Sequence, residues 1–158
     1  RPFSVTADES RLYAQLSNTH SVIAYAVKAR AVVARVDLPV NAGVTEPDWD
    51  FAAPHHGLAL TPDESRLCIA GRASDYAAVL ATEGLALLGT IDVGDAPSWA
   101  ALDASGQTCV LANTRSDDVS FVSMATLQEL ARIKVGRAPK HVTIGRVPES
   151  VLAARDAE

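Results

Sequence analysis

Residues 53–94 read APHHGLALTPDESRLCIAGRASDYAAVLATEGLALLGTIDVG, and residues 96–136 read APSWAALDASGQTCVLANTRSDDVSFVSMATLQELARIKVG. Each stretch starts at Ala-Pro and ends at Val-Gly, and turn-forming residues stand at matching places in both. Pro54, Pro97 and Pro139 are 43 and 42 residues apart, and residues 4–39 follow the same pattern. The chain therefore contains a tandem repeat of about 42 residues, and a repeat of this kind decides the class of fold.

Each repeat contains four short runs of apolar or alternating residues, which in the second unit are 58–61, 66–70, 77–81 and 85–93. The runs are too short for helices, Val, Ile and Thr recur in them, and turn residues separate them. Four strands in every ~42 residues are typical of a propeller blade. A β-sandwich does not repeat its sequence at a fixed period, and helical solenoids need a 3.6-residue periodicity. The sequence thus predicts an all-β fold, a β-propeller of four-stranded antiparallel blades.

The period places three complete blades at about 1–38, 54–94 and 95–136, followed by one inner strand at 140–146. Residues 39–53 are an insertion between the first two blades, and residues 147–158 form a C-terminal tail that reads as a short helix or irregular segment. About three and a half blades make a partial propeller, because closed propellers have roughly four to eight. Since the chain starts at Arg1 rather than Met, we expect N-terminal blades to be missing from a full-length form of about seven. The open blade faces predict self-association.

The composition excludes several classes of function. The formal net charge is −5, the Arg residues are scattered and only three Lys occur, so the clustered cationic surface needed for nucleic-acid binding is absent. No apolar stretch approaches the ~20 residues of a membrane-spanning helix. The sequence also has no phosphate-binding loop, Rossmann glycine pattern or Gly-x-Ser-x-Gly motif. We therefore expect neither a nucleic-acid partner nor a membrane span.

The repeat resembles a known family. The series Pro-x-x-apolar-Ala-Leu-(Ser/Thr)-Pro-Asp, Arg-Leu-x-apolar-Ala, a Ser-Asn/Asp turn and a terminal Thr-Ile-x-Val-Gly is similar to the YVTN family of β-propeller repeats, over roughly residues 3–145. That family is similar to the wider group of quinoprotein amine dehydrogenases and the nitrous oxide reductase propeller. The resemblance implies a WD40-like repeat fold and a periplasmic or secreted protein. It implies little about function, because such repeats serve enzymes, binding modules and surface proteins alike.

Candidate site residues gather where the chain enters the inner strands, because these loops and the turns between second and third strands share one face of a propeller. The insertion is the one large irregularity in the repeat, and long loops on rigid scaffolds often carry function. The candidate ligand-binding residues are Asp48, Trp49, Asp50, His55, His56, Trp99 and His141.

Two functions are compatible with these residues. The first is a non-catalytic binding or scaffold propeller that takes a protein or a small molecule on the loops between blades and needs no cofactor. The alternative is a metal-dependent hydrolase or oxidoreductase, in which His55, His56 and His141 hold a transition metal at the channel mouth. Trp99 stands at the matching position of the third unit, so the histidine set is not continuous from blade to blade.

The remaining polar residues have structural interpretations. Asp8, Asp63 and Asp103 lie in or beside turns, where an aspartate side chain accepts hydrogen bonds from the backbone. Cys68 and Cys109 lie one residue out of register on equivalent strands, so they point to opposite faces of their blades. Packed sheets are about 10 Å apart and a disulfide needs Cα atoms within about 7 Å, so the sequence predicts two buried, reduced cysteines.

Overall fold

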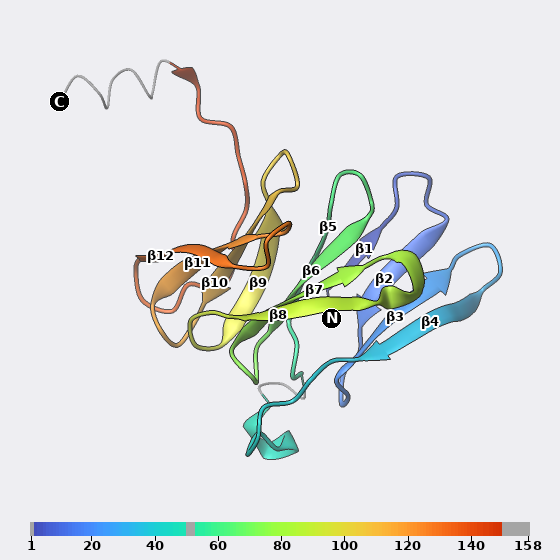
Figure 1. The fold of residues 1–158 in the computed structure, drawn as a ribbon, viewed down its shortest axis with the longest axis horizontal. Helices are drawn as coiled ribbons and strands as arrows, with labels where there is room; N and C mark the ends of the chain where they lie inside the picture. Colours follow the sequence, from blue (N-terminus) through green and yellow to red (C-terminus); the bar gives the residue numbers. More distant parts are fainter. Residues whose placement is uncertain (1, 50–52, 150–158) are drawn as a thin grey trace.

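The computed structural model describes residues 2–49 and 53–149, and within them the chain forms three four-stranded antiparallel sheets that stand beside one another as blades (Figure 1). Blade 1 consists of β1 (Phe3–Val5), β2 (Arg11–Gln15), β3 (Ser21–Ala26) and β4 (Ala31–Asp37). Blade 2 consists of β5 (Gly57–Leu60), β6 (Arg66–Gly71), β7 (Tyr76–Ala81) and β8 (Leu87–Asp92). Blade 3 consists of β9 (Pro97–Leu102), β10 (Thr108–Asn113), β11 (Asp118–Ser123) and β12 (Glu129–Lys134).

Every blade is a meander, because strands that follow each other in the sequence pair in order. The first strands are the inner ones: β5 contacts β1 on one side and β9 on the other. Among the described residues two short 3-10 helices, η1 (Glu46–Asp48) and η3 (Glu83–Leu85), lie between strands. The predicted all-β class and the partial propeller are confirmed, and no helix in the described part of the chain is long and apolar enough to cross a membrane.

An aspartate builds the turn between the first and second strands of each blade. Oδ1 of Asp63 accepts a hydrogen bond from the Ser65 backbone N–H at 3.0 Å, and Asp8 accepts the equivalent bond from Ser10. In the third blade Oδ1 of Asp103 accepts from the Thr108 backbone N–H, across the same turn. The third turn uses Gly106, whose φ of 71° is one that glycine adopts without strain. The structural interpretation of the three aspartates is therefore confirmed.

Two apolar clusters hold the blades together, one on each face of blade 2. The cluster between blades 1 and 2 contains large side chains, among them Tyr13, Leu67, Ile69 and Leu80. The cluster between blades 2 and 3 combines larger side chains with five small ones, namely Val79, Ile91, Val93, Leu111, Val122 and Met124 with Ala70, Ala77, Ala100, Cys68 and Cys109. The small side chains let blades 2 and 3 approach closely around the two cysteines.

The predicted state of the cysteines is wrong, because Cys68 of β6 and Cys109 of β10 form a disulfide with a Cα–Cα distance of 6.5 Å. Both residues are fully buried, as expected, and they do point toward each other from opposite faces of neighbouring blades. The prediction failed because it assumed a sheet spacing of about 10 Å, which holds for sheets separated by full-sized side chains. Here alanine and glycine line the gap: an added Cβ at Gly57 would lie 2.5 Å from the backbone nitrogen of Ala100.

The segment after blade 3 also differs from the prediction. Residues 139–148 have no regular secondary structure, so no inner strand forms at 140–146. A strand needs a partner to complete its hydrogen bonds, and no described strand pairs with this segment. It follows blade 3 instead: the Thr114 hydroxyl donates to the carbonyl oxygen of Pro139 at 2.9 Å, and His141 packs on Trp99. Most of the predicted tail, 147–158, lies outside the described residues.

Candidate functional site

One end of the three blades carries all the predicted site residues that the structure describes. We call it the loop face: residues 39–49, 53–56, 95–99 and 137–141, with the turns 17–20, 72–75 and 114–117. In Figure 1 the insertion, with η1, projects from this end. Asp50 lies outside the described residues.

Hydrogen bonds between neighbouring blades fix the loops of this face. Oδ1 of Asp75 accepts from the Ala96 backbone N–H, and Oδ1 of Asp117 accepts from the Ala138 N–H, both at 2.8 Å. The insertion is anchored differently, because the Asn41 side chain donates to the backbone oxygen of Ser74 at 2.7 Å. The loop into β9 and the segment after β12 are thus each tied to the turn of the preceding blade, and the insertion is tied to the turn of blade 2.

A first group of rings crosses from the insertion to blade 2. His20 lies between Trp49 and His55, with ring centroids 4.8 and 5.2 Å away and nearly perpendicular planes. The Nε2 atom of His55 is 2.9 Å from the hydroxyl of Tyr76, which donates to the backbone oxygen of Pro39 at 2.8 Å. We call Trp49, His20, His55 and Tyr76 the buried ring group.

Burial governs the charge of this group. His55 is 2% exposed, and its burial, followed by the neighbouring His20, lowers its pKa to about 3. Burial also lowers the pKa of His20 and raises that of Tyr76. Both imidazoles and the phenol are therefore neutral at pH 7.

A second group of rings lies at equivalent positions of successive repeats. Trp99, which is half-buried, packs against the exposed His141 with centroids 4.4 Å apart and against His56 at 6.3 Å. Nδ1 of His56 bonds to the backbone oxygen of Ser98 at 2.9 Å, so its ring is held in place. We call His56, Trp99 and His141 the ring platform.

The predicted metal site of three histidines is not assembled. His55 belongs to the buried ring group, whereas His56 and His141 each contact Trp99. Oδ2 of Asp48 is already occupied, because it accepts from the Thr45 backbone and hydroxyl at 2.7 and 2.9 Å. Those bonds lower the pKa of Asp48. In residues 2–49 and 53–149, no group of three or more His, Cys, Asp or Glu side chains is placed to hold a metal ion.

Sequence analysis missed three residues of this face: His20, Tyr76 and Arg72. Arg72 is almost fully buried, and its guanidinium donates to the Ala96 backbone oxygen at 3.1 Å and to the hydroxyl of Ser98. It thereby fixes the loop that leads into β9 and Trp99. A buried arginine is rare and needs partners, but the repeat gives no sign of its burial, because Ser17 and Thr114 stand at the equivalent positions of the other blades.

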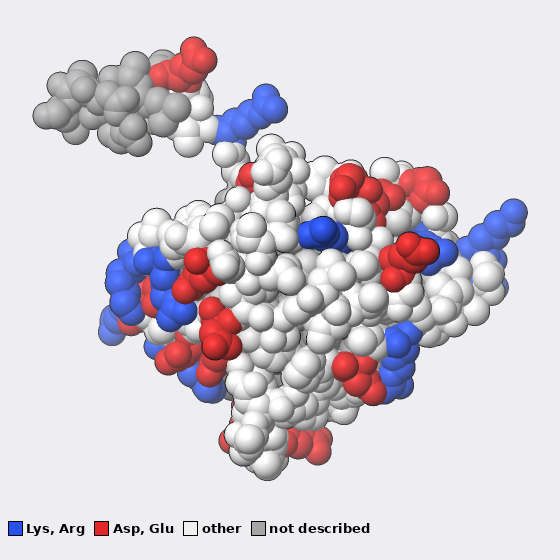
Figure 2. Space-filling model, viewed as in Figure 1, with Lys and Arg blue, Asp and Glu red and all other residues white. Residues whose placement is uncertain are grey.

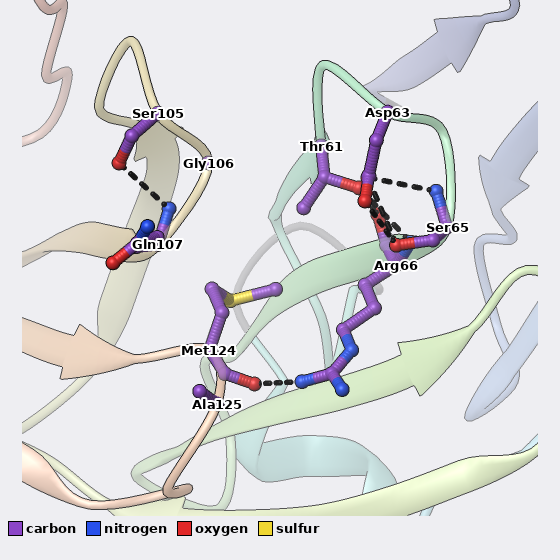
Figure 3. Close-up of a pocket in the computed structure, with 9 residues that line it drawn as sticks. All are labelled: Thr61, Asp63, Ser65, Arg66, Ser105, Gly106, Gln107, Met124 and Ala125. Carbon is purple, nitrogen blue, oxygen red and sulfur yellow. Dashed lines mark hydrogen bonds between the residues drawn. The ribbon is translucent and has the colours of Figure 1, made fainter.

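A separate polar pocket lies at the opposite end of blades 2 and 3, with a volume of about 300 Å³. Figure 3 shows its walls: the turn 61–66 of blade 2, the turn 105–107 of blade 3, and Met124 with Ala125. The Arg66 guanidinium donates to the Met124 backbone oxygen, and Asp63 accepts from Ser65. Its charged groups therefore already have partners within the turns, so the pocket is a weaker candidate than the loop face.

Asp63 supplies a test of the turn assignment. Hydrogen bonds from Thr61 and then Ser65 lower its pKa to about 2. A depressed carboxyl pKa stabilises the fold above about pH 4, and this contribution is lost as the pH falls through about 2. We expect Asp63→Asn to lower the unfolding temperature at pH 6 but to have little effect at pH 2. Equal destabilisation at both pH values, measured by thermal unfolding, would contradict this role.

Charge does not select a polyanionic partner. In Figure 2 acidic and basic side chains are interspersed over the face in view. This agrees with the net charge of −5 and the scattered arginines.

Comparisons with known proteins support the fold. No family model and no curated protein matches the chain. It is similar to the periplasmic gluconolactonase PpgL of Pseudomonas aeruginosa, with 22% identity over 94% of this chain and 43% of that chain, and a TM-score of 0.75. It is also similar to Kuenenia stuttgartiensis hydrazine synthase (19%, 87% and 36%, TM-score 0.73) and to the RRP9 WD40 repeats (15%, 87% and 39%, TM-score 0.71).

At these identities the likeness establishes a β-propeller fold alone. The chain spans about two fifths of the length of the structures it resembles. The propellers among them include an enzyme and WD40 repeats, so the fold does not choose between catalysis and binding. The narrower YVTN resemblance remains a prediction.

Proposed function

We propose that this chain is part of an extracytoplasmic ligand-binding propeller whose ring platform binds a small polyhydroxylated molecule, such as a sugar acid or sugar lactone. The observation that carries the proposal is the position of Trp99 between His56 and His141, at 6.3 and 4.4 Å. The C–H groups of a sugar ring pack on the face of an aromatic ring, which carries negative charge density from the π-electrons. Imidazole nitrogens can form hydrogen bonds with the sugar hydroxyls. An aromatic surface with a few polar groups is typical of small-molecule sites.

Side chains of both signs lie near the platform. Lys140 precedes His141 and Arg115 lies on the adjoining turn, while Asp95 and Asp117 lie on the same loops. The charge of the loop face therefore does not choose between a neutral sugar and a sugar acid. The likeness to a gluconolactonase is the reason for choosing D-gluconate and its 1,5-lactone as test compounds. The proposal itself rests on the geometry of the ring platform.

Two observations support a location outside the cytoplasm. The disulfide Cys68–Cys109 is one, because disulfides persist in oxidising compartments and are rare in the cytosol. The likeness to a periplasmic gluconolactonase is the other. A protein partner on the same loops is the competing form of this proposal, and further blades, from the same chain or a second copy, would complete the ring around the platform.

The chain has two tryptophans, so fluorescence can test the platform directly. In a Trp49→Phe background, where Trp99 is the remaining indole, we expect saturable change of emission on addition of D-gluconate. His141→Ala should weaken the apparent affinity by about tenfold, because it removes one wall of the platform. Gln107→Ala, in the pocket at the other end, is the matched control and should leave the affinity unchanged.

The enzyme alternative is tested in the same samples. A catalytic propeller would accelerate hydrolysis of freshly dissolved D-glucono-1,5-lactone above the buffer rate, in proportion to protein concentration. We expect binding without acceleration. Two results would refute the ring platform as the site. One is a Trp99 emission that responds to neither compound. The other is an apparent affinity that His141→Ala and Gln107→Ala weaken equally.

A further inference from the structure

We propose that His20 and His55 bind a first-row transition-metal cation through their Nδ1 atoms. This site is distinct from the ring platform, and the inference does not depend on the proposed function. It uses one histidine that the sequence analysis did not select, and it does not involve His56 or His141.

His20 breaks the repeat at a position that is otherwise structural. The backbone oxygens of His20, Asp75 and Asp117 accept equivalent bonds from Leu38, Val93 and Val135, so these three residues are equivalent in the blades. Asp75 and Asp117 use their carboxylates to cap the next loop, through the N–H groups of Ala96 and Ala138. Imidazole replaces the carboxylate only in blade 1, where the following loop is the long insertion and the ring turns to Trp49 and His55.

The hydrogen bonds of His55 fix its tautomer. The Tyr76 hydroxyl proton is directed to the Pro39 backbone oxygen, so the hydroxyl oxygen must accept from His55 Nε2–H. Nδ1 of His55 is then unprotonated, and its lone pair has no hydrogen-bond partner. A neutral imidazole nitrogen of this kind is the usual protein ligand of zinc and copper.

Three buried nitrogens of the ring group have no hydrogen-bond partner: Nδ1 of His20, Nδ1 of His55 and Nε1 of Trp49. Buried polar atoms normally have partners. His55 itself is 2% exposed, so water outside the protein does not reach its side chain. Two imidazole nitrogens left unpaired in neighbouring rings are the arrangement that a metal ion satisfies.

The spacing of the two rings fits one shared ion. With metal–nitrogen bonds of about 2.1 Å and an imidazole radius of about 1.2 Å, two imidazoles on a tetrahedral ion have centroids roughly 5 Å apart. The observed distance is 5.2 Å. No third His, Cys, Asp or Glu joins them among the described residues, so a bound ion would complete its coordination with ligands from outside the protein, which must enter past the partly exposed His20.

Copper(II) is the probe, because it binds nitrogen ligands most strongly among the divalent ions of the series and quenches a nearby indole. In untagged Trp99→Phe protein, where Trp49 is the remaining indole, we expect saturable quenching at about one ion per chain. His20→Asn removes one of the two proposed ligands. It should weaken the apparent affinity by at least about tenfold, because even mutating a residue that only hydrogen-bonds to a metal ligand can cost that much. His141→Asn is the matched control and should leave the affinity within about twofold.

His55→Gln is a second variant, with circular dichroism as the check of its fold, and it should weaken binding as His20→Asn does. If His55→Gln fails to fold, the copper affinities of His20→Asn and His141→Asn still test the proposal. Saturable quenching that is unchanged in His20→Asn, or that is lost in His141→Asn instead, would overturn the assignment. So would the absence of saturable quenching in the Trp99→Phe protein.

Discussion

Replacing Cys68 and Cys109 together by alanine is expected to lower the free energy of unfolding by about 4 kcal/mol, the loop-closure value for a bridge of this span. The two residues are 41 apart in the sequence, so the bridge removes much of the freedom of the unfolded chain. In a protein of this size the loss corresponds to a fall of roughly 10 °C in the unfolding temperature. Thermal and urea unfolding of the oxidised wild type and the double variant measure it.

The same samples contain their own control. Reductant should lower the stability of the wild type toward that of the double variant and should not change the double variant. A tryptic digest without reduction should join residues 67–72 to residues 73–115, because trypsin cleaves after Arg66, Arg72 and Arg115. Free cysteines in the oxidised protein, or a double variant as stable as wild type, would contradict the role of the bridge.

Gly57→Ala is expected to cost about 3 kcal/mol or more, the upper end of what overpacking costs in a core. The added Cβ would lie 2.5 Å from the Ala100 nitrogen and 2.7 Å from the Trp99 Cα, and backbone atoms cannot move aside as a flexible side chain does. Blades 2 and 3 must then separate, which displaces Trp99 and strains the bridge between β6 and β10. We expect a red shift of the Trp99 emission in a Trp49→Phe background together with the loss of stability.

Gly136→Ala is the matched control, because nothing lies within 4 Å of the Cβ it would add. It should leave both the stability and the emission of Trp99 nearly unchanged. If Gly57→Ala were as mild as Gly136→Ala, the close approach of the two blades would be wrong, and with it the explanation of the disulfide.

The fold could be predicted from the sequence because the pattern of strands and turns that makes one blade occurs three times. Turn-forming residues stand at matching places in each repeat, as at Asp8 and Asp63, and alternation in the strands defines which side chains face a neighbouring blade. The residue register even placed the two cysteines on facing sides. What it could not supply is the distance between blades, which depends on the small residues Gly57, Ala70 and Ala100 packed against each other.

The site was predictable in position but not in grouping. The sequence indicated that Trp99, His56 and His141 share a face, because they occupy equivalent positions in successive repeats. It did not separate His55 from them, since adjacent residues at a strand entrance point in different directions. His20 was missed because its turn looks ordinary until the backbone register shows that the next two blades place aspartate there.

Nuclear magnetic resonance of the indole N–H groups tests the central claim, that the ring platform is the ligand site, most directly. The chain has two tryptophans, and both lie on the loop face, so a ¹⁵N-labelled sample gives one indole signal for Trp49 and one for Trp99. On addition of D-gluconate we predict that the Trp99 signal shifts to saturation while the Trp49 signal moves little. A Trp99 signal that stays in place at saturating D-gluconate would contradict the account.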